Sequence, residues 1–126
     1  MVGRRILLIN PNSSEATTAM MVAIARSAAA GGFDIVGATA TRAPAMIVTP
    51  EALEGAAPEV AEIAQAHRNE CDGFIVAAFG DPGLNAIRAG LMPPAAGIGS
   101  ATRRRVWRST VPARSARGRG SPSEPL

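Results

Sequence analysis

Short apolar runs alternate along the chain with longer stretches in which apolar residues recur at helical spacing. Four of the runs are bounded by turn residues and predict strands: 5–9, 33–39, 73–78 and 95–98. The third run is continuously apolar, which is typical of a central parallel strand buried on both faces. Strands that alternate with helices in this way predict an α/β fold with an open parallel sheet and helices on both of its faces.

The stretches between the strands carry helix start signals. Each signal is a capping residue, and the second and third are followed by proline: Ser13 or Ser14, Thr49 before Pro50, and Asp81 before Pro82. The first helix is expected to place Met20 and Ile24 on one apolar face and to end at Gly31 and Gly32. The third helix is expected to be short and to end near Gly90.

The second helix is expected to be amphipathic. Its apolar face carries Val60, Ile63 and Ala64, and its solvated face carries Glu59, Glu62 and Arg68. Pro58 is expected to divide a short first helix from the main one, because proline lacks the N–H group that a helix interior requires.

Two loops are the candidates for chemistry. In the flavodoxin-like strand order 2-1-3-4, the first and third strands are central neighbours and ligands bind outside their carboxyl ends, which brings residues 10–14 and 79–83 together. Both loops lead into helix N-termini, whose free N–H groups suit a carboxylate or an imide oxygen. Asn10 and Asn12 serve equally well as ligand contacts or as turn residues, whereas Asp81 is expected to act first as a helix cap.

Composition removes several function classes. A length of 126 residues predicts a single domain. The chain is 47% hydrophobic but only 3% aromatic, so we expect its core to be aliphatic. All thirteen basic residues are Arg, so a lysine Schiff base with pyridoxal phosphate and a lysine-dependent phosphate-binding loop are excluded. One Cys and one His are too few for structural zinc, and we expect neither a metal nor a cofactor. No apolar run reaches the length of a membrane span, and the expected location is the cytoplasm.

Neither of the two residues most often used in catalysis lies near the candidate loops. His67 is expected on the solvated face of the second helix. Cys71 precedes the third strand, at the end of the sheet opposite the loops, and is expected to be a buried, inert thiol.

Three segments together resemble a known family. Residues 6–14 read ILLINPNSS, residues 79–84 read FGDPGL and residues 97–99 read GIG. In this order and spacing they resemble the aspartate/glutamate/hydantoin racemase family, and the first two segments together are typical of its hydantoin racemase branch. The resemblance spans residues 4–99.

The resemblance implies a cofactor-independent racemase built from two similar α/β lobes, with a small substrate (an amino acid, a hydantoin or a related carboxylate or imide) between them. Each lobe supplies one cysteine, so that a proton is removed from one face of the α-carbon and returned to the other. Residues 1–99 would form the first lobe. A homo-oligomer is compatible with the resemblance. The implied substrate contacts are Asn10, Asn12, Ser13, Phe79, Gly80 and Asp81.

The sequence departs from the family at the position that carries the chemistry. Ala78 occupies the place of the family's cysteine before FGDPG, and Cys71 lies seven residues too early to replace it. We therefore expect the chain as given to be inactive. Two alternatives stay open: a related decarboxylase or isomerase that uses one cysteine, and a non-catalytic module that binds a small ligand.

Residues 100–126 differ from the rest in charge. Residues 1–100 carry six Arg and nine acidic residues, a net charge of −3, while residues 101–126 carry seven Arg and one Glu, a net charge of +6. The family continues with Glu after GIG where this chain has Ser100, and a displaced reading frame compatible with these residues restores that Glu. We expect residues 100–126 to be out-of-frame translation; the alternatives are a basic disordered tail and, less favoured, binding to nucleic acid.

Overall fold

The computed structural model describes residues 4–90 and 93–99, and residues 100–126 lie outside this part of the chain. Strands and helices alternate: β1 (Arg4–Asn10), α1 (Glu15–Ala29), β2 (Phe33–Thr39), α2 (Pro50–Ala66), β3 (Gly73–Val76), α3 (Leu84–Ala89) and β4 (Ala95–Gly97). All strand pairs are parallel, and the sheet has the order β2-β1-β3-β4. The predicted fold class and strand order are confirmed.

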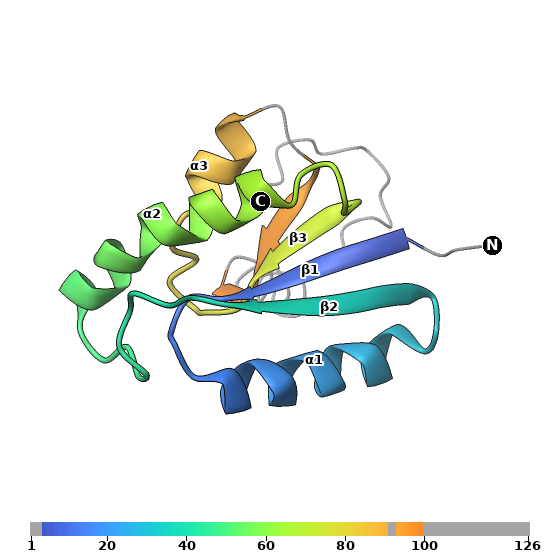
Figure 1. Ribbon diagram of the computed structural model, residues 1–126, viewed down its shortest axis with the longest axis horizontal. Helices are drawn as coiled ribbons and strands as arrows, with labels where there is room; N and C mark the ends of the chain where they lie inside the picture. Colours follow the sequence, from blue (N-terminus) through green and yellow to red (C-terminus); the bar gives the residue numbers. More distant parts are fainter. Residues whose placement is uncertain (1–3, 91–92, 100–126) are drawn as a thin grey trace, which may run out of the picture.

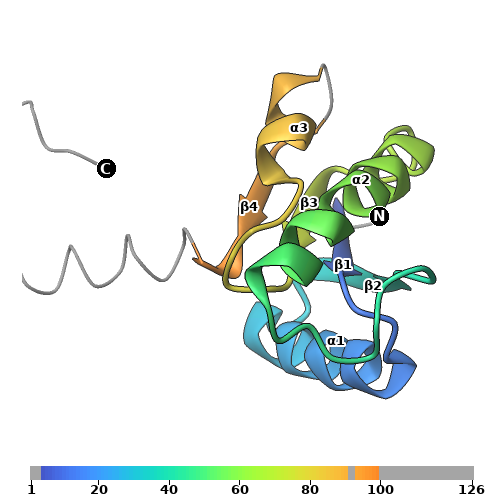
Figure 2. The same ribbon diagram turned by 90° about the vertical axis from the view of Figure 1, so that its left-hand side faces the viewer.

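The sheet is covered on both faces, α1 packing on one and α2 with α3 on the other (Figures 1 and 2). The strand β1 pairs with β2 along one edge and with β3 along the other. Its side chains alternate between the layers: Leu7 and Ile9 pack under α2 and α3, and Leu8 packs against α1. Burial on both faces explains why this part of the sequence is apolar without a break.

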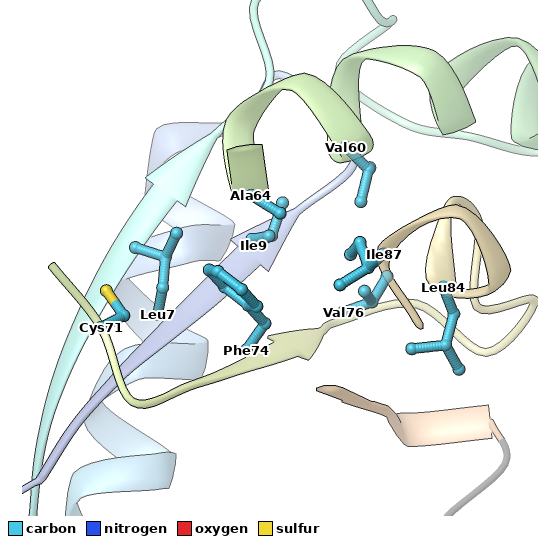
Figure 3. Packing of buried hydrophobic residues seen from close by; sticks show 9 residues of the cluster. All are labelled: Leu7, Ile9, Val60, Ala64, Cys71, Phe74, Val76, Leu84 and Ile87. Carbon is cyan, nitrogen blue, oxygen red and sulfur yellow. The ribbon is translucent and has the colours of Figure 1, made fainter. Parts of the chain in front are cut away.

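The larger core lies between the sheet and the pair α2 and α3 (Figure 3). Ile9, Val60, Val76 and Ile87 meet there and are fully buried. They come from two strands and two helices, so this cluster joins four elements that are distant in sequence.

The helix α1 begins as predicted but buries a different face. Ser14 is its N-cap and accepts a hydrogen bond from the Thr17 N–H, while the left-handed residue at its end is Ala30, one position before the predicted glycine pair. Met20 and Ile24 do not face the core: they are 55% and 62% exposed. The residues of α1 that face the sheet are instead Thr18, which is polar, and Val22. Both fit against β2 because Gly37 has no Cβ to occupy the space that they fill.

Two predictions for α2 are wrong. The helix runs without a break through Pro58, whose exposed ring is flanked on the core side by buried residues such as Val60 that hold the helix against the sheet. Glu59, expected on the solvated face, is only 7% exposed. Its carboxylate turns inward because it accepts hydrogen bonds from the Thr41 N–H (2.7 Å), the Thr41 hydroxyl (2.9 Å) and the Arg42 N–H (3.0 Å).

The start of α3 also differs from the prediction. The N-cap is Gly83, in the left-handed region at φ 82°, and no side chain caps this helix. Asp81 lies two residues before the N-cap position, and its Oδ1 accepts a hydrogen bond from the distant Gly99 N–H. The third and fourth strands are shorter than predicted and end at Val76 and Gly97. Within the described residues no helix combines the length and the apolar character needed to cross a membrane.

The two isoleucines Ile9 and Ile24 separate core packing from surface exposure. Ile9→Ala should lower the free energy of unfolding by about 2–5 kcal/mol, because it empties space in the larger core. Ile24→Ala, on the exposed face of α1, should change it by no more than about 0.5 kcal/mol. Urea denaturation of both variants measures the difference, and equal losses would contradict the assignment of faces.

Glu59 should make stability depend on pH. Burial alone raises the pKa of Glu59, but the hydrogen bonds from Thr41 and Arg42 outweigh it and hold the pKa below its ordinary value of 4.5. A lowered folded-state pKa stabilises the fold above about pH 4.5, and this contribution is lost as the pH falls below that value.

Glu59→Gln should therefore cost about 1.5–3 kcal/mol at pH 7, and the difference from the unsubstituted chain should shrink below pH 4.5. Urea denaturation across this pH range is the measurement. Glu62→Gln, on the same helix but exposed, is the matched control and should change little at any pH. A difference for Glu59→Gln that does not vary with pH would show that the carboxylate is not charged in the fold.

Candidate functional site

The candidate site is a groove of about 520 Å³ at the carboxyl ends of the central strands. The loops that follow β1, β2 and β3 leave the sheet at this edge, on the left in Figure 1. The groove is lined by Asn10, Pro11, Asn12, Met46, Ile47, Val48, Thr49, Pro50, Leu53, Ala77, Ala78, Phe79 and Gly80. Its walls come from three separate parts of the chain. Two of them, the loops after β1 and β3, were predicted from the sequence to lie together.

Asn10 builds the first wall. Its side chain is 1% exposed, and its amide nitrogen lies 2.8 Å from Asn12 Oδ1, 3.0 Å from Thr18 Oγ1 and 3.1 Å from the Ser14 carbonyl oxygen. Its Oδ1 accepts the Asn12 N–H at 3.1 Å. Both ends of this amide are bonded to the loop or to the first turn of α1, so Asn10 shapes the wall.

The side chain of Asn12 uses its oxygen within the loop but not its NH₂ group. Its Oδ1 accepts hydrogen bonds from Asn10 Nδ2 at 2.8 Å and from the Ser14 N–H at 2.9 Å. Its own side-chain NH₂ group donates to no residue within 4–90 or 93–99. The two asparagines, which the sequence could not tell apart, therefore have different surroundings: one is saturated and the other keeps a donor at the groove.

The second wall is the turn after β3. Ala77 still donates its N–H to the Ile9 carbonyl oxygen at 2.9 Å, and the chain then leaves the sheet. The backbone N–H groups of Ala78, Phe79 and Gly80 find no acceptor in the part of the chain that the structure describes. This wall offers successive backbone donors beside the Phe79 ring, which is 68% exposed.

The third wall was not predicted. Residues 46–49 of the β2–α2 loop, together with Pro50 and Leu53 of α2, close the groove on its apolar side. Met46 and Val48 are 71% and 75% exposed, and Leu53 packs where Gly80 has no side chain. A signal was present in the sequence, because Met46-Ile47-Val48 is an apolar triplet inside a loop that follows a strand on the site side. Glu59 anchors the first part of this loop.

Two predicted contacts lie outside the groove lining. Ser13 is half-buried and donates its N–H to the Pro44 carbonyl oxygen at 3.1 Å, so it ties the first loop to the third. Asp81 follows the second wall and accepts the Gly99 N–H at 2.8 Å.

Cys71 and His67 both lie away from the groove; Cys71 is buried before β3 as predicted, whereas His67 follows the last residue of α2 and is half-buried. Cys71 is 8% exposed just before β3, and burial raises the pKa of its thiol above the ordinary value, with partial compensation from Arg5. The imidazole Nδ1 of His67 lies 2.9 Å from the Ile63 carbonyl oxygen at the end of α2. Neither side chain lines the groove.

Comparison with known proteins identifies the family of this chain. Residues 6–110 match the family described as Asp/Glu/hydantoin racemase. The hydantoin racemase of Paenarthrobacter aurescens is 36% identical over 105 residues, and that of Pseudomonas sp. (strain NS671) is 35% identical over 95 residues. The solved structure of an allantoin racemase from Klebsiella pneumoniae superposes with a TM-score of 0.76 at 36% identity, and the match covers 82% of this chain.

The match is to one part of these relatives. The aligned region covers 42% of the Paenarthrobacter racemase, 38% of the Pseudomonas racemase and 42% of the Klebsiella chain. The family match over residues 6–110 begins within β1, includes every later strand and helix, and extends past the boundary at residue 99 that we expected from the change in charge. The chain therefore belongs to the Asp/Glu/hydantoin racemase family.

Proposed function

We propose that this chain is the substrate-binding first lobe of a cofactor-independent racemase for hydantoins or related cyclic ureides, and that as given it binds the ligand without interconverting enantiomers. The observation that carries the proposal is the position of Ala78. It lies in the groove lining, between the end of β3 and the exposed Phe79, where the family resemblance implies a cysteine.

The groove offers two kinds of contact. On its polar side are the Asn12 NH₂ group and the backbone N–H groups of residues 78–80, which suit the carbonyl oxygens of an imide or ureide ring. On its apolar side are Met46, Val48 and Leu53, which suit a substituent on the ring. A small, flat, uncharged ring with carbonyl groups and one side chain satisfies both.

Among the described residues that line the groove, none has a side chain suited to moving a proton at the α-carbon. A racemase must remove the proton on one face and deliver another on the opposite face, and a methyl group at position 78 can do neither. Cys71 lies at the other end of β3 with a raised pKa, so its thiol is both distant and protonated. Binding without turnover is the behaviour these residues support.

A second function is favoured by the same observation. If the natural protein carries Ala at position 78, the chain is a ligand-binding module in which catalysis has been lost. A related decarboxylase or isomerase with one cysteine would have that cysteine elsewhere in its sequence. Sequencing the gene through codon 78 and on to the next stop codon distinguishes these cases.

Ligand binding should depend on the Asn12 donor. Asn12→Asp keeps the Oδ1 acceptor for Asn10 and Ser14 but removes the NH₂ group, so the affinity for a 5-substituted hydantoin should fall about 3- to 10-fold. The matched control is Asn69→Asp, in the exposed turn after α2, which should leave affinity unchanged. Isothermal titration is the measurement. No binding to the unsubstituted chain, or equal effects of the two variants, would contradict the proposal.

Ala78→Cys should restore half of the chemistry. One thiolate can take the α-proton and return a deuteron to the same face, so the variant should exchange the α-hydrogen of a bound hydantoin in D₂O faster than a buffer blank. Proton NMR measures the exchange and chiral chromatography measures inversion, which should stay at the blank rate. Ala78→Ser is the control, because a hydroxyl is too weak an acid to ionise near neutral pH and therefore cannot remove the α-proton. Interconversion of enantiomers by the unsubstituted chain would refute its proposed inactivity.

A further inference from the structure

We propose that Asp81 is a positioning residue, a latch that holds the groove wall formed by residues 78–80 in place by tying it to the chain that leaves β4. The proposal rests on the proposed function in so far as that wall contacts a ligand. Its structural part stands on the contacts of Asp81 alone.

The backbone of Asp81 adopts an unfavourable conformation. Its φ is +50°, and among the described residues only Ala30 shares the left-handed region without being glycine. Such a residue costs on the order of 1 kcal/mol and persists only where its surroundings hold it. Asp tolerates this region better than most residues do, because its short polar side chain bonds locally.

Hydrogen bonds to two described residues, Ala78 and Gly99, help to hold Asp81 there. Its N–H donates to the Ala78 carbonyl oxygen at 3.0 Å, which closes the turn over residues 78–81. Its Oδ1 accepts the Gly99 N–H at 2.8 Å, from a segment eighteen residues later in the chain. One residue thus joins the turn after β3 to the exit of β4, and a carboxylate acceptor makes the second bond a strong one.

The glycines of the GIG segment make room for this latch. A Cβ on Gly97 would overlap the Asp81 carboxylate, and a Cβ on Gly99 would overlap the Phe79 carbonyl oxygen. The β4 exit therefore lies directly against the Phe79 backbone of the groove wall. The segments GIG and FGDPG are distant in sequence, but they pack against each other at this edge of the sheet.

Three substitutions separate the two properties of Asp81, which are its side-chain acceptor and its tolerance of the left-handed backbone conformation. Asp81→Asn keeps both an acceptor and tolerance of the left-handed region, Asp81→Gly keeps only the backbone freedom, and Asp81→Ala keeps neither. The matched control is Asp72→Gly, because the Asp72 carboxylate also accepts a backbone N–H, that of Arg5 at 2.8 Å, at the opposite end of the sheet.

Two readouts are needed. Amide hydrogen exchange of the full chain, followed by ¹⁵N NMR, reports on Gly99 and on residues 78–80, and titration with a 5-substituted hydantoin reports on the groove. Asp81→Gly should speed exchange at Gly99 at least tenfold and weaken binding about 3- to 10-fold, while Asp81→Asn should restore both within about threefold. Asp81→Ala should match or exceed the losses of Asp81→Gly, and Asp72→Gly should leave both readouts at the groove unchanged.

The outcomes are distinct. Exchange at Gly99 that is unaffected by Asp81→Gly, or binding lost equally in Asp72→Gly, overturns the latch. If the unsubstituted chain binds no hydantoin, the proposed function fails, and exchange at Gly99 still tests the latch. If Asp81→Gly does not fold, exchange at Gly99 in the unsubstituted chain decides: tenfold protection supports the latch and unprotected exchange overturns it.

Discussion

The position of β1 is the constraint on which the rest of the structure depends. It is paired along both edges, with β2 and β3, and its side chains are buried on both faces, so it leaves the chain little freedom in how the other elements attach. Since all neighbouring strands run parallel to it, their carboxyl ends meet at one edge of the sheet. The groove forms there because three loops must leave the sheet side by side.

Buried or half-buried polar side chains around that edge mostly serve the backbone. Asn10 holds the loop after β1, Glu59 holds the loop after β2, and Asp81 holds the turn after β3. In each case a side chain supplies the hydrogen-bond partner that an irregular segment lacks, at the place where the sheet can no longer supply one. The groove itself is left with backbone N–H groups, one asparagine amide and an apolar wall, which are means of binding more than of catalysis.

Family membership does not by itself decide the chemistry of this chain. The sequence match and the fold similarity both place the chain in the Asp/Glu/hydantoin racemase family, and the match spans about two fifths of the relatives' length. Yet the side chain at position 78 is a methyl group in the middle of the groove wall. In the proposed function, the scaffold that positions a substrate is therefore separable from the group that would act on it.

The sequence by itself determined the order of elements, the parallel sheet and the edge where the loops gather, because apolar periodicity and caps such as Ser14 are local signals. It could not decide which polar residues turn inward. Glu59 was expected in solvent and Asp81 at a helix cap, yet both bond to backbone groups that are distant in the chain. Only tertiary structure supplies such partners, and only it could add Met46 and Val48 to the groove, since no local pattern shows where a loop folds back.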